Sequence, residues 1–216
     1  MEGVEMIKRV FRELIGGILA SLCIAIGGSV FLACDNKYLG AVFFSVALLS
    51  ICLLGFSLFT GKIGFTVEDH SAGNIIGVIA CLIGNFIGCS FFGLLIKLGL
   101  PSLSEKAETL CSAKLLQSFP EAIIRAFFCG VLMYIAVWVF RAKSKLIGIL
   151  FCIPVFILCG FEHSIADMFY FADAGIYTGQ ALLYQLTIVL GNTIGGVFIP
   201  LVEILRSSLE NKPKGE

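Results

Sequence analysis

The residues with the most chemical potential in this chain lie in one short segment, at 159–168. Glu162, His163 and Asp167 fall within six residues of each other, in a half of the chain that is otherwise strongly apolar. Carboxyl and imidazole groups carry protons, bind metal ions and assist hydrolysis. Because ionisable side chains are costly at membrane depth, we treat these three residues as candidates for function.

Metal binding or catalysis would need further groups from elsewhere in the chain. The second histidine, His70, stands beside Glu68 and Asp69 in a polar stretch expected at the opposite side of the membrane. No Ser-His-acid or metalloprotease spacing is present, and the nine cysteines contain no Cys-x-x-Cys. We therefore expect no metal, no cofactor and no enzymatic activity. A histidine that only satisfies hydrogen bonds inside a core remains an open alternative for His163.

The composition indicates a membrane protein. Hydrophobic residues make up 58% of the chain and charged residues 14%, with a mean hydropathy of +1.00, which leaves too little polar surface for a soluble globule. The first three apolar runs exceed the roughly 20 residues that cross a bilayer as helix, and the later three are more broken. The six runs lie at 14–34, 39–61, 71–96, 126–140, 146–161 and 174–202. We predict an all-α fold with six transmembrane helices, the second and fifth interrupted.

The chain repeats itself at about half its length. Gly-Asn-Phe-Ile-Gly at 84–88 returns as Gly-Asn-Thr-Ile-Gly at 191–195, and Gly-Phe at 55–56 returns at 160–161. We predict one channel domain over 1–216, built from repeats at about 10–98 and 118–206. Helices interrupted at matching places point to a solute site, because freed backbone groups are tolerated only where they line a cavity or are buried in protein. Asn85 and Asn192 are expected to hold the two breaks, with simple interhelical bonding as the alternative.

The placement of Lys and Arg predicts the orientation. With six spans, ten of these fifteen residues fall on the side of the N-terminus, among them Lys212 and Lys214. Both termini are therefore predicted to face the cytoplasm in a multi-pass protein of the cell membrane. Three spans per repeat, an odd number, places the halves in opposite orientations, as an inverted repeat. The net charge of zero gives no indication of a nucleic-acid partner.

Five motifs in register resemble the formate/nitrite transporter family over nearly the whole chain. They are Leu-Phe-Thr-Gly at 58–61, the two Gly-Asn motifs, Ala-Val-Trp at 136–138 and Gly-Phe-Glu-His-Ser at 160–164. The resemblance implies an aquaporin-like fold and a homopentamer in which each subunit holds its own pore. It also implies passage of small monovalent anions such as formate, nitrite, lactate or hydrosulfide.

Residue by residue, the resemblance places His163 and Thr60 opposite each other at the centre of the pore. It implies that Glu162 braces the broken helix rather than contacting solute, and that Arg125 serves as a basic residue of the vestibule. This chain departs from the family pattern in having Ser57 for a common Glu, Asp167 for a common Asn, and Tyr134 for an Asn. The apolar constrictions are expected at Phe44, Leu48, Leu58, Phe59 and Phe156.

A physical argument leads to the same class of function. A bare anion crossing apolar constrictions loses hydration that one hydroxyl and one imidazole cannot replace. A proton supplied through His163, or directly by solvent in the vestibule, would let a weak acid pass as a neutral molecule. We predict a channel or transporter for small weak-acid anions with proton-coupled passage. A neutral-solute channel of the aquaporin type is the second hypothesis, and an intramembrane metalloenzyme is the third.

Overall fold

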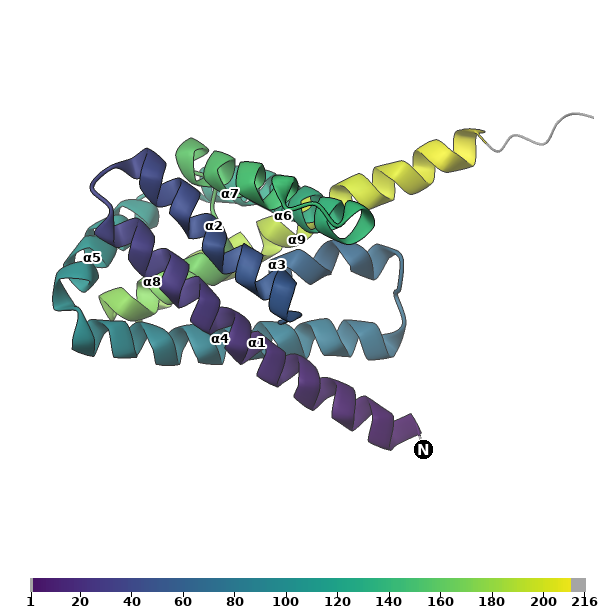
Figure 1. The fold of residues 1–216 in the computed structure, drawn as a ribbon, viewed down its shortest axis with the longest axis horizontal. Coiled ribbons are helices and arrows are strands. Elements are labelled where there is room, and N and C mark those ends of the chain that lie inside the picture. The colour runs from purple at the N-terminus through teal and green to yellow at the C-terminus, as the bar shows by residue number, and fades with distance from the viewer. Residues whose placement is uncertain (1, 211–216) are drawn as a thin grey trace, which may run out of the picture.

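The computed structural model describes residues 2–210, and these form a bundle of helices (Figure 1). Nine α-helices and one 3-10 helix occur within this described range. In chain order the elements are α1 (Glu2–Ala33), α2 (Lys37–Leu54), α3 (Phe59–Lys62), the 3-10 helix η1 (Ile63–Val67), α4 (Ala72–Gly99), α5 (Pro101–Leu115), α6 (Phe119–Lys143), α7 (Ile147–Cys159), α8 (Ser164–Ala174) and α9 (Gly179–Glu210).

Six segments can cross a membrane. The helices α1, α2, α4, α6 and α9 are each long and apolar enough, and α7 with α8 forms a sixth span that bends by 57° at a short break. The second span is interrupted as well, since α2 stops at Leu54 and the chain resumes as the short α3 and η1. The predicted all-α architecture of six spans, with the second and fifth broken, is confirmed.

The two halves pack in the same way. In the first half α1 contacts α4 and α2, and in the second α6 contacts α9 and α7. A Cβ atom on Gly84 would overlap the carbonyl group of Leu14 on α1, and one on Gly195 would overlap that of Phe127 on α6. Glycine therefore allows the closest helix approach within each half, which accounts for part of the repeated motif.

The two breaks share one backbone conformation. Gly55 ends α2 with φ of 71°, and Gly160 ends α7 with φ of 69°, in the left-handed region that glycine enters without strain. Three residues later, Leu58 and His163 precede α3 and α8 with φ of −111° and −110°, both extended. The same turn therefore brings Leu58 and His163 to equivalent places in the two halves.

The connection between the halves is largely helical. Residues 99–117 join the two repeats, and most of them form α5, with Pro101 in the first turn. Ser104, Ala107 and Cys111 are buried in this helix, which packs against α8. The last span also begins later than the apolar run at 174–202, because α8 continues to Ala174 and ends at Gly175 in a left-handed turn.

The two ends of the described range, 2–210, lie on the same side of the bundle. Figure 1 shows the start of α1 and the last turns of α9 projecting at one end, whereas α5 lies at the opposite end. This arrangement is what an even number of spans requires. Lys212 and Lys214, two of the cations used to predict orientation, lie outside the described residues.

A candidate solute pathway between two cavities

The first break is held by Asn85 of α4. Its side-chain oxygen accepts a hydrogen bond from the backbone N–H of Phe59 at 2.9 Å. Its amide nitrogen donates to the carbonyl groups of Gly17 on α1 and Ser57 in the break, at 2.9 and 3.0 Å. The side chain is fully buried, so these bonds satisfy backbone groups that water cannot reach.

Asn192 of α9 makes the same three contacts at the second break. It accepts from the backbone N–H of Ser164 at 2.8 Å, and it donates to the carbonyl groups of Ala126 on α6 and Glu162, both at 2.8 Å. Glu162 and Ser164 are each 105 positions after Ser57 and Phe59, the lag that also relates the two glycine turns. Each asparagine therefore bridges three segments within its own half.

Thr60 and His163 meet between the two breaks. The hydroxyl oxygen of Thr60 lies 2.8 Å from Nε2 of His163, and the two side chains are 1% and 3% exposed. The other ring nitrogen, Nδ1, accepts the backbone N–H of Ala166 at 3.1 Å, which caps α8. We therefore assign the ring proton to Nε2, from which it is donated to the Thr60 oxygen.

Two cavities approach this pair from opposite sides. The α5-side cavity, of about 400 Å³, is lined by residues from the first turns of α2 and α6, including Lys37 and Glu121, and by His163. The termini-side cavity, of about 330 Å³, is lined by later residues of the same helices, among them Cys52 and Arg141. Because both helices run from one cavity toward the other, the cavities lie at opposite ends of the bundle.

Apolar side chains form the inner wall of each cavity. Phe44 and Phe156 border the α5-side cavity, with their rings edge to face at 6.2 Å, and Phe156 stacks on His163 at 5.6 Å. Leu48 and Leu58 border the termini-side cavity. All four are 4% exposed or less. Buried apolar side chains therefore lie on each side of the central pair.

Phe59 occupies a different place from these four. It is buried in the hydrophobic core and lines neither of the two cavities. Its backbone N–H is the group that Asn85 holds. The turn directs Leu58 toward the termini-side cavity, and Phe59 follows it in α3. The role of Phe59 in a constriction stays a prediction.

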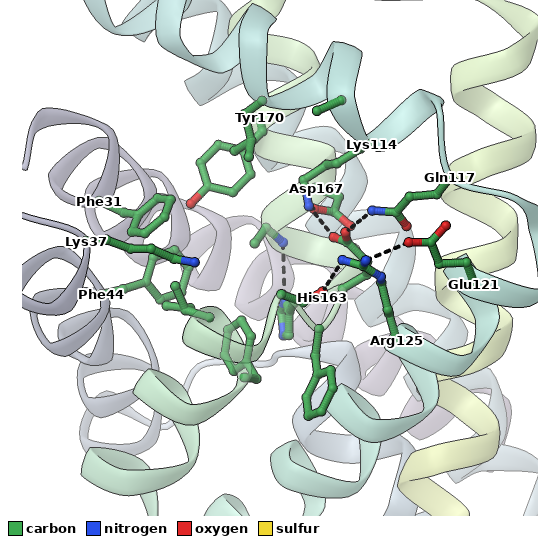
Figure 2. Close-up of a pocket in the computed structure, with 18 residues that line it drawn as sticks. Phe31, Lys37, Phe44, Lys114, Gln117, Glu121, Arg125, His163, Asp167 and Tyr170 are labelled. Atoms are coloured by element: carbon green, nitrogen blue, oxygen red, sulfur yellow. Dashed lines mark hydrogen bonds and ion pairs between the residues drawn. The ribbon is translucent and has the colours of Figure 1, made fainter. Parts of the chain in front are cut away.

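A buried ionic cluster lies in the α5-side cavity wall. Lys114 of α5 forms ion pairs with Glu162 and with Asp167 of α8, the latter at 3.0 Å. The side-chain nitrogen of Gln117 donates to the other oxygen of Glu162 at 2.7 Å. Figure 2 shows Lys114, Asp167 and Gln117 close together, above His163 in that view. The carboxylate of Glu162 thus belongs to the cavity wall, whereas its backbone holds the break: the carbonyl accepts from Asn192 and the N–H donates to the Arg125 carbonyl at 3.4 Å.

Lys114 stays charged in this setting. Burial by itself would lower the pKa of its ammonium group, but the carboxylates of Asp167 and Glu162 outweigh that effect and raise this pKa above its ordinary value. The spacing of Ser104, Ala107 and Cys111 continues to Lys114 at intervals of three and four residues, which places all four on one helix face. That periodicity is the signal that could have identified Lys114 as an inward-facing residue.

Arg125 also lines the α5-side cavity, as the resemblance implied. Its guanidinium donates to the carbonyl group of Gly160 at 3.2 Å and to the carboxylate of Glu121 at 2.6 Å. Lys37 and Tyr170 line the same cavity and were not singled out from the sequence.

The first break carries an ionic cluster of its own. Glu13 of α1 is 6% exposed and forms an ion pair with Lys62, and it accepts a hydrogen bond from the hydroxyl of Ser57 at 2.7 Å. Ser57 corresponds by repeat to Glu162. The carboxylate near the first break therefore comes from α1 rather than from the break itself.

The described residues contain no group of three His, Cys, Asp or Glu side chains placed to hold a metal ion. Glu162 and Asp167 converge on Lys114, while His163 uses its ring nitrogens for Ala166 and Thr60. Hydrogen bonding and proton exchange are the chemistry that this arrangement offers.

Comparison with known proteins is decisive at this point. Residues 2–205 match the family model described as formate/nitrite transporter. The chain belongs to the formate/nitrite transporter family. It is 32% identical to the uncharacterized transporter YrhG of Bacillus subtilis, over 84% of this chain and 76% of that protein. It is 29% identical to the nitrite transporter NirC of Escherichia coli, over 79% of this chain and 71% of that protein.

Solved structures of formate/nitrite transporters share the fold. An FNT family ion channel superposes with a TM-score of 0.79 at 23% identity, covering 93% of this chain and 90% of that one. A pentameric formate channel with formate bound gives a TM-score of 0.72 at 22% identity, covering 93% and 98%. The chain is thus a multi-pass membrane protein from a family of transporters and channels, not of enzymes.

Proposed function

We propose that this formate/nitrite transporter conducts small monovalent weak-acid anions, of the formate, nitrite or hydrosulfide type, with proton-coupled passage past His163. The observation that carries the proposal is the Thr60–His163 contact between two cavities, with buried apolar side chains on each side. We infer that these side chains form an apolar narrowing on each side of the pair. The names of the relatives, a nitrite transporter and several formate channels, support the same class of solute.

The apolar narrowing argues for a neutral permeating species. Phe44 and Phe156 on one side, and Leu48 and Leu58 on the other, offer no polar group to a desolvated ion. Between them lie the Thr60 hydroxyl and the His163 ring, which can bond to solute. A weak-acid anion that takes up a proton in one cavity crosses as the neutral acid, and it releases the proton in the other.

In this proposal His163 acts as a neutral hydrogen-bond donor. A second ring proton would have to sit on Nδ1, where it would displace the bond from the Ala166 N–H that caps α8. The ring would also carry charge in a fully buried place. The transported proton therefore comes from the α5-side cavity rather than from the imidazole.

A neutral-solute channel of the aquaporin type is the second candidate, because the central Thr60–His163 pair is uncharged. Proteoliposome uptake distinguishes the two functions. We expect formate, nitrite, hydrosulfide, acetate and lactate to differ in rate, and an inward proton gradient to accelerate those that enter. Swelling with glycerol or water, without uptake of any of the five anions, would favour the second candidate.

We further propose a homopentamer with its N- and C-termini in the cytoplasm of the cell. The pentameric formate channel among the similar structures supports the assembly, and the excess of Lys and Arg on the side of the N-terminus supports the orientation. After cross-linking in mild detergent, the largest cross-linked species should contain five subunits. A stable monomer or dimer would contradict the assembly without affecting the pathway within each subunit.

A further inference from the structure

The buried cluster in the α5-side cavity has an unbalanced charge. One ammonium group, that of Lys114, faces two carboxyl groups, those of Glu162 and Asp167. The three side chains are 12%, 4% and 2% exposed, and the remaining close partner, Gln117, is neutral. If both acids were ionised, the cluster would hold a net charge of −1 away from water, which is costly in a membrane protein.

One carboxyl oxygen of the cluster also lacks a partner. Oδ1 of Asp167 accepts from Lys114 at 3.0 Å, and both oxygens of Glu162 are bonded, one to Lys114 and one to Gln117. Oδ2 of Asp167 is sealed from solvent and accepts no hydrogen bond from the described residues. A buried carboxylate oxygen without a donor is strongly disfavoured. A proton on this oxygen removes the unbalanced charge and leaves no ionised oxygen without a donor.

We propose that Glu162 and Asp167 hold one proton between them above Lys114, and that this carboxyl pair gives the proton to the weak-acid anion entering the α5-side cavity. This inference rests on the proposed function and names the group that supplies its proton. In the step, the O–H bond of the pair breaks and an O–H or S–H bond forms on the anion. The pair is left with one more negative charge, which a proton from cavity water then neutralises.

The groups around Asp167 are consistent with one proton on the pair. Lys114 is the cation in contact with it, and the neighbouring thiols and phenols are neutral donors at ordinary pH. His163 is not a competing holder, because its Nδ1 accepts from Ala166 and its Nε2 faces Thr60. The other titratable groups that interact electrostatically with Asp167 are Cys111 of α5, Cys129 of α6, Tyr170 of α8 and Tyr184 of α9.

Asp167→Asn is the variant that tests the proposal. It preserves the shape of the side chain, and with one acid left the cluster is neutral without a held proton. Formate uptake by this variant should then fall about tenfold per pH unit between about pH 6 and pH 8, as the concentration of formic acid in bulk water does. Wild-type uptake should fall less steeply.

Asp173→Asn is the matched control. Asp173 lies on the same helix, is fully buried and accepts a hydrogen bond from Ser104 at 2.5 Å, but it lines neither of the two cavities. Its variant should keep the wild-type pH profile. If Asp167→Asn also keeps that profile, the proposal is wrong. If wild-type protein shows no proton-linked uptake at all, the proposed function is wrong, and the role of the carboxyl pair as its proton donor is wrong with it.

A second measurement does not depend on transport or on assembly. Infrared difference spectra of wild type minus Asp167→Asn, recorded in detergent at neutral pH, should contain the carbonyl band of a protonated carboxyl group that shifts in heavy water. Glu162→Gln should remove the same band, because either substitution leaves a single acid opposite Lys114. A band that is absent from wild type, or that survives both substitutions, would overturn the proposal.

Discussion

The hydroxyl oxygen of Thr60 lies 2.8 Å from Nε2 of His163, and this contact joins residues 103 positions apart, one from beyond each helix break. Each break is a left-handed glycine turn held by a buried asparagine, so the contact is positioned from both halves. A hydrogen-bond donor and its acceptor thus meet between the two cavities, with buried apolar side chains on each side.

Substitution of His163 should separate its donor role from a titrating role. His163→Asn retains an N–H donor and a side chain that can cap α8, so we expect uptake to persist with its pH dependence intact. His163→Phe keeps the ring volume but loses the donor, and loss of the cap should cost about 1 kcal/mol of stability. Formate uptake across pH, together with thermal unfolding in detergent, measures both effects. If His163→Asn transports with a flat pH profile, the ring itself carries the proton.

The hydroxyl group of Thr60 should be required for rapid uptake. Thr60→Val leaves the buried Nε2–H without an acceptor, at a cost of about 1–3 kcal/mol. If the permeating solute loses a hydrogen bond of similar free energy to this hydroxyl, uptake should slow by about ten- to a hundredfold. Thr60→Ser restores the hydroxyl and should recover most of the rate. Equal rates for the Val and Ser variants would exclude this role of the hydroxyl.

Phe156 should set the size limit on the α5 side. Phe156→Ala widens the narrowing without removing a polar group, so lactate and acetate should gain uptake relative to formate. Phe151→Ala on the same helix is the control, because Phe151 is 64% exposed and lies away from both cavities. Competition between formate and lactate in proteoliposomes gives the ratio. An unchanged ratio in Phe156→Ala would place the size limit elsewhere.

The two asparagines should contribute strongly to stability. Asn85→Ala or Asn192→Ala removes three hydrogen bonds to buried backbone groups, and we expect each to cost about 2–4 kcal/mol. Ser90→Ala is the control, since its hydroxyl only bonds the Phe86 carbonyl within α4, and it should change stability by less than about 0.5 kcal/mol. Thermal unfolding in one detergent compares the three. Asparagine variants as stable as Ser90→Ala would show that the breaks need no such support.

Much of this fold is predictable from the sequence, because lipid imposes a strong constraint. Backbone groups must bond internally there, so apolar length locates the spans, and repeated glycines locate the breaks. Because Gly55 is equivalent to Gly160 in the repeat, Leu58 is equivalent to His163. A polar histidine therefore stands at a position that is apolar in the first half. Helix α5 was missed because a short helix covering one end of a bundle has no long apolar run.

The charged part of the site was harder to predict from the sequence. Asp167 stands out in the sequence, but its partner Lys114 comes from another segment, and no local pattern links the two. Glu13 is a similar case, since only the folded structure brings it from α1 to Ser57. Local patterns identify the residues of the breaks, whereas ion pairs between distant segments depend on the packing that the breaks produce.

The stoichiometry of proton and formate entry tests the central claim most directly. Proteoliposomes containing a pH-sensitive dye would receive an inward formate gradient, with protein-free liposomes correcting for leakage through lipid. We predict that one proton enters with each formate ion, so that the interior acidifies in step with uptake and no membrane potential develops. Formate entry that generates a membrane potential and leaves the internal pH unchanged would contradict proton-coupled passage.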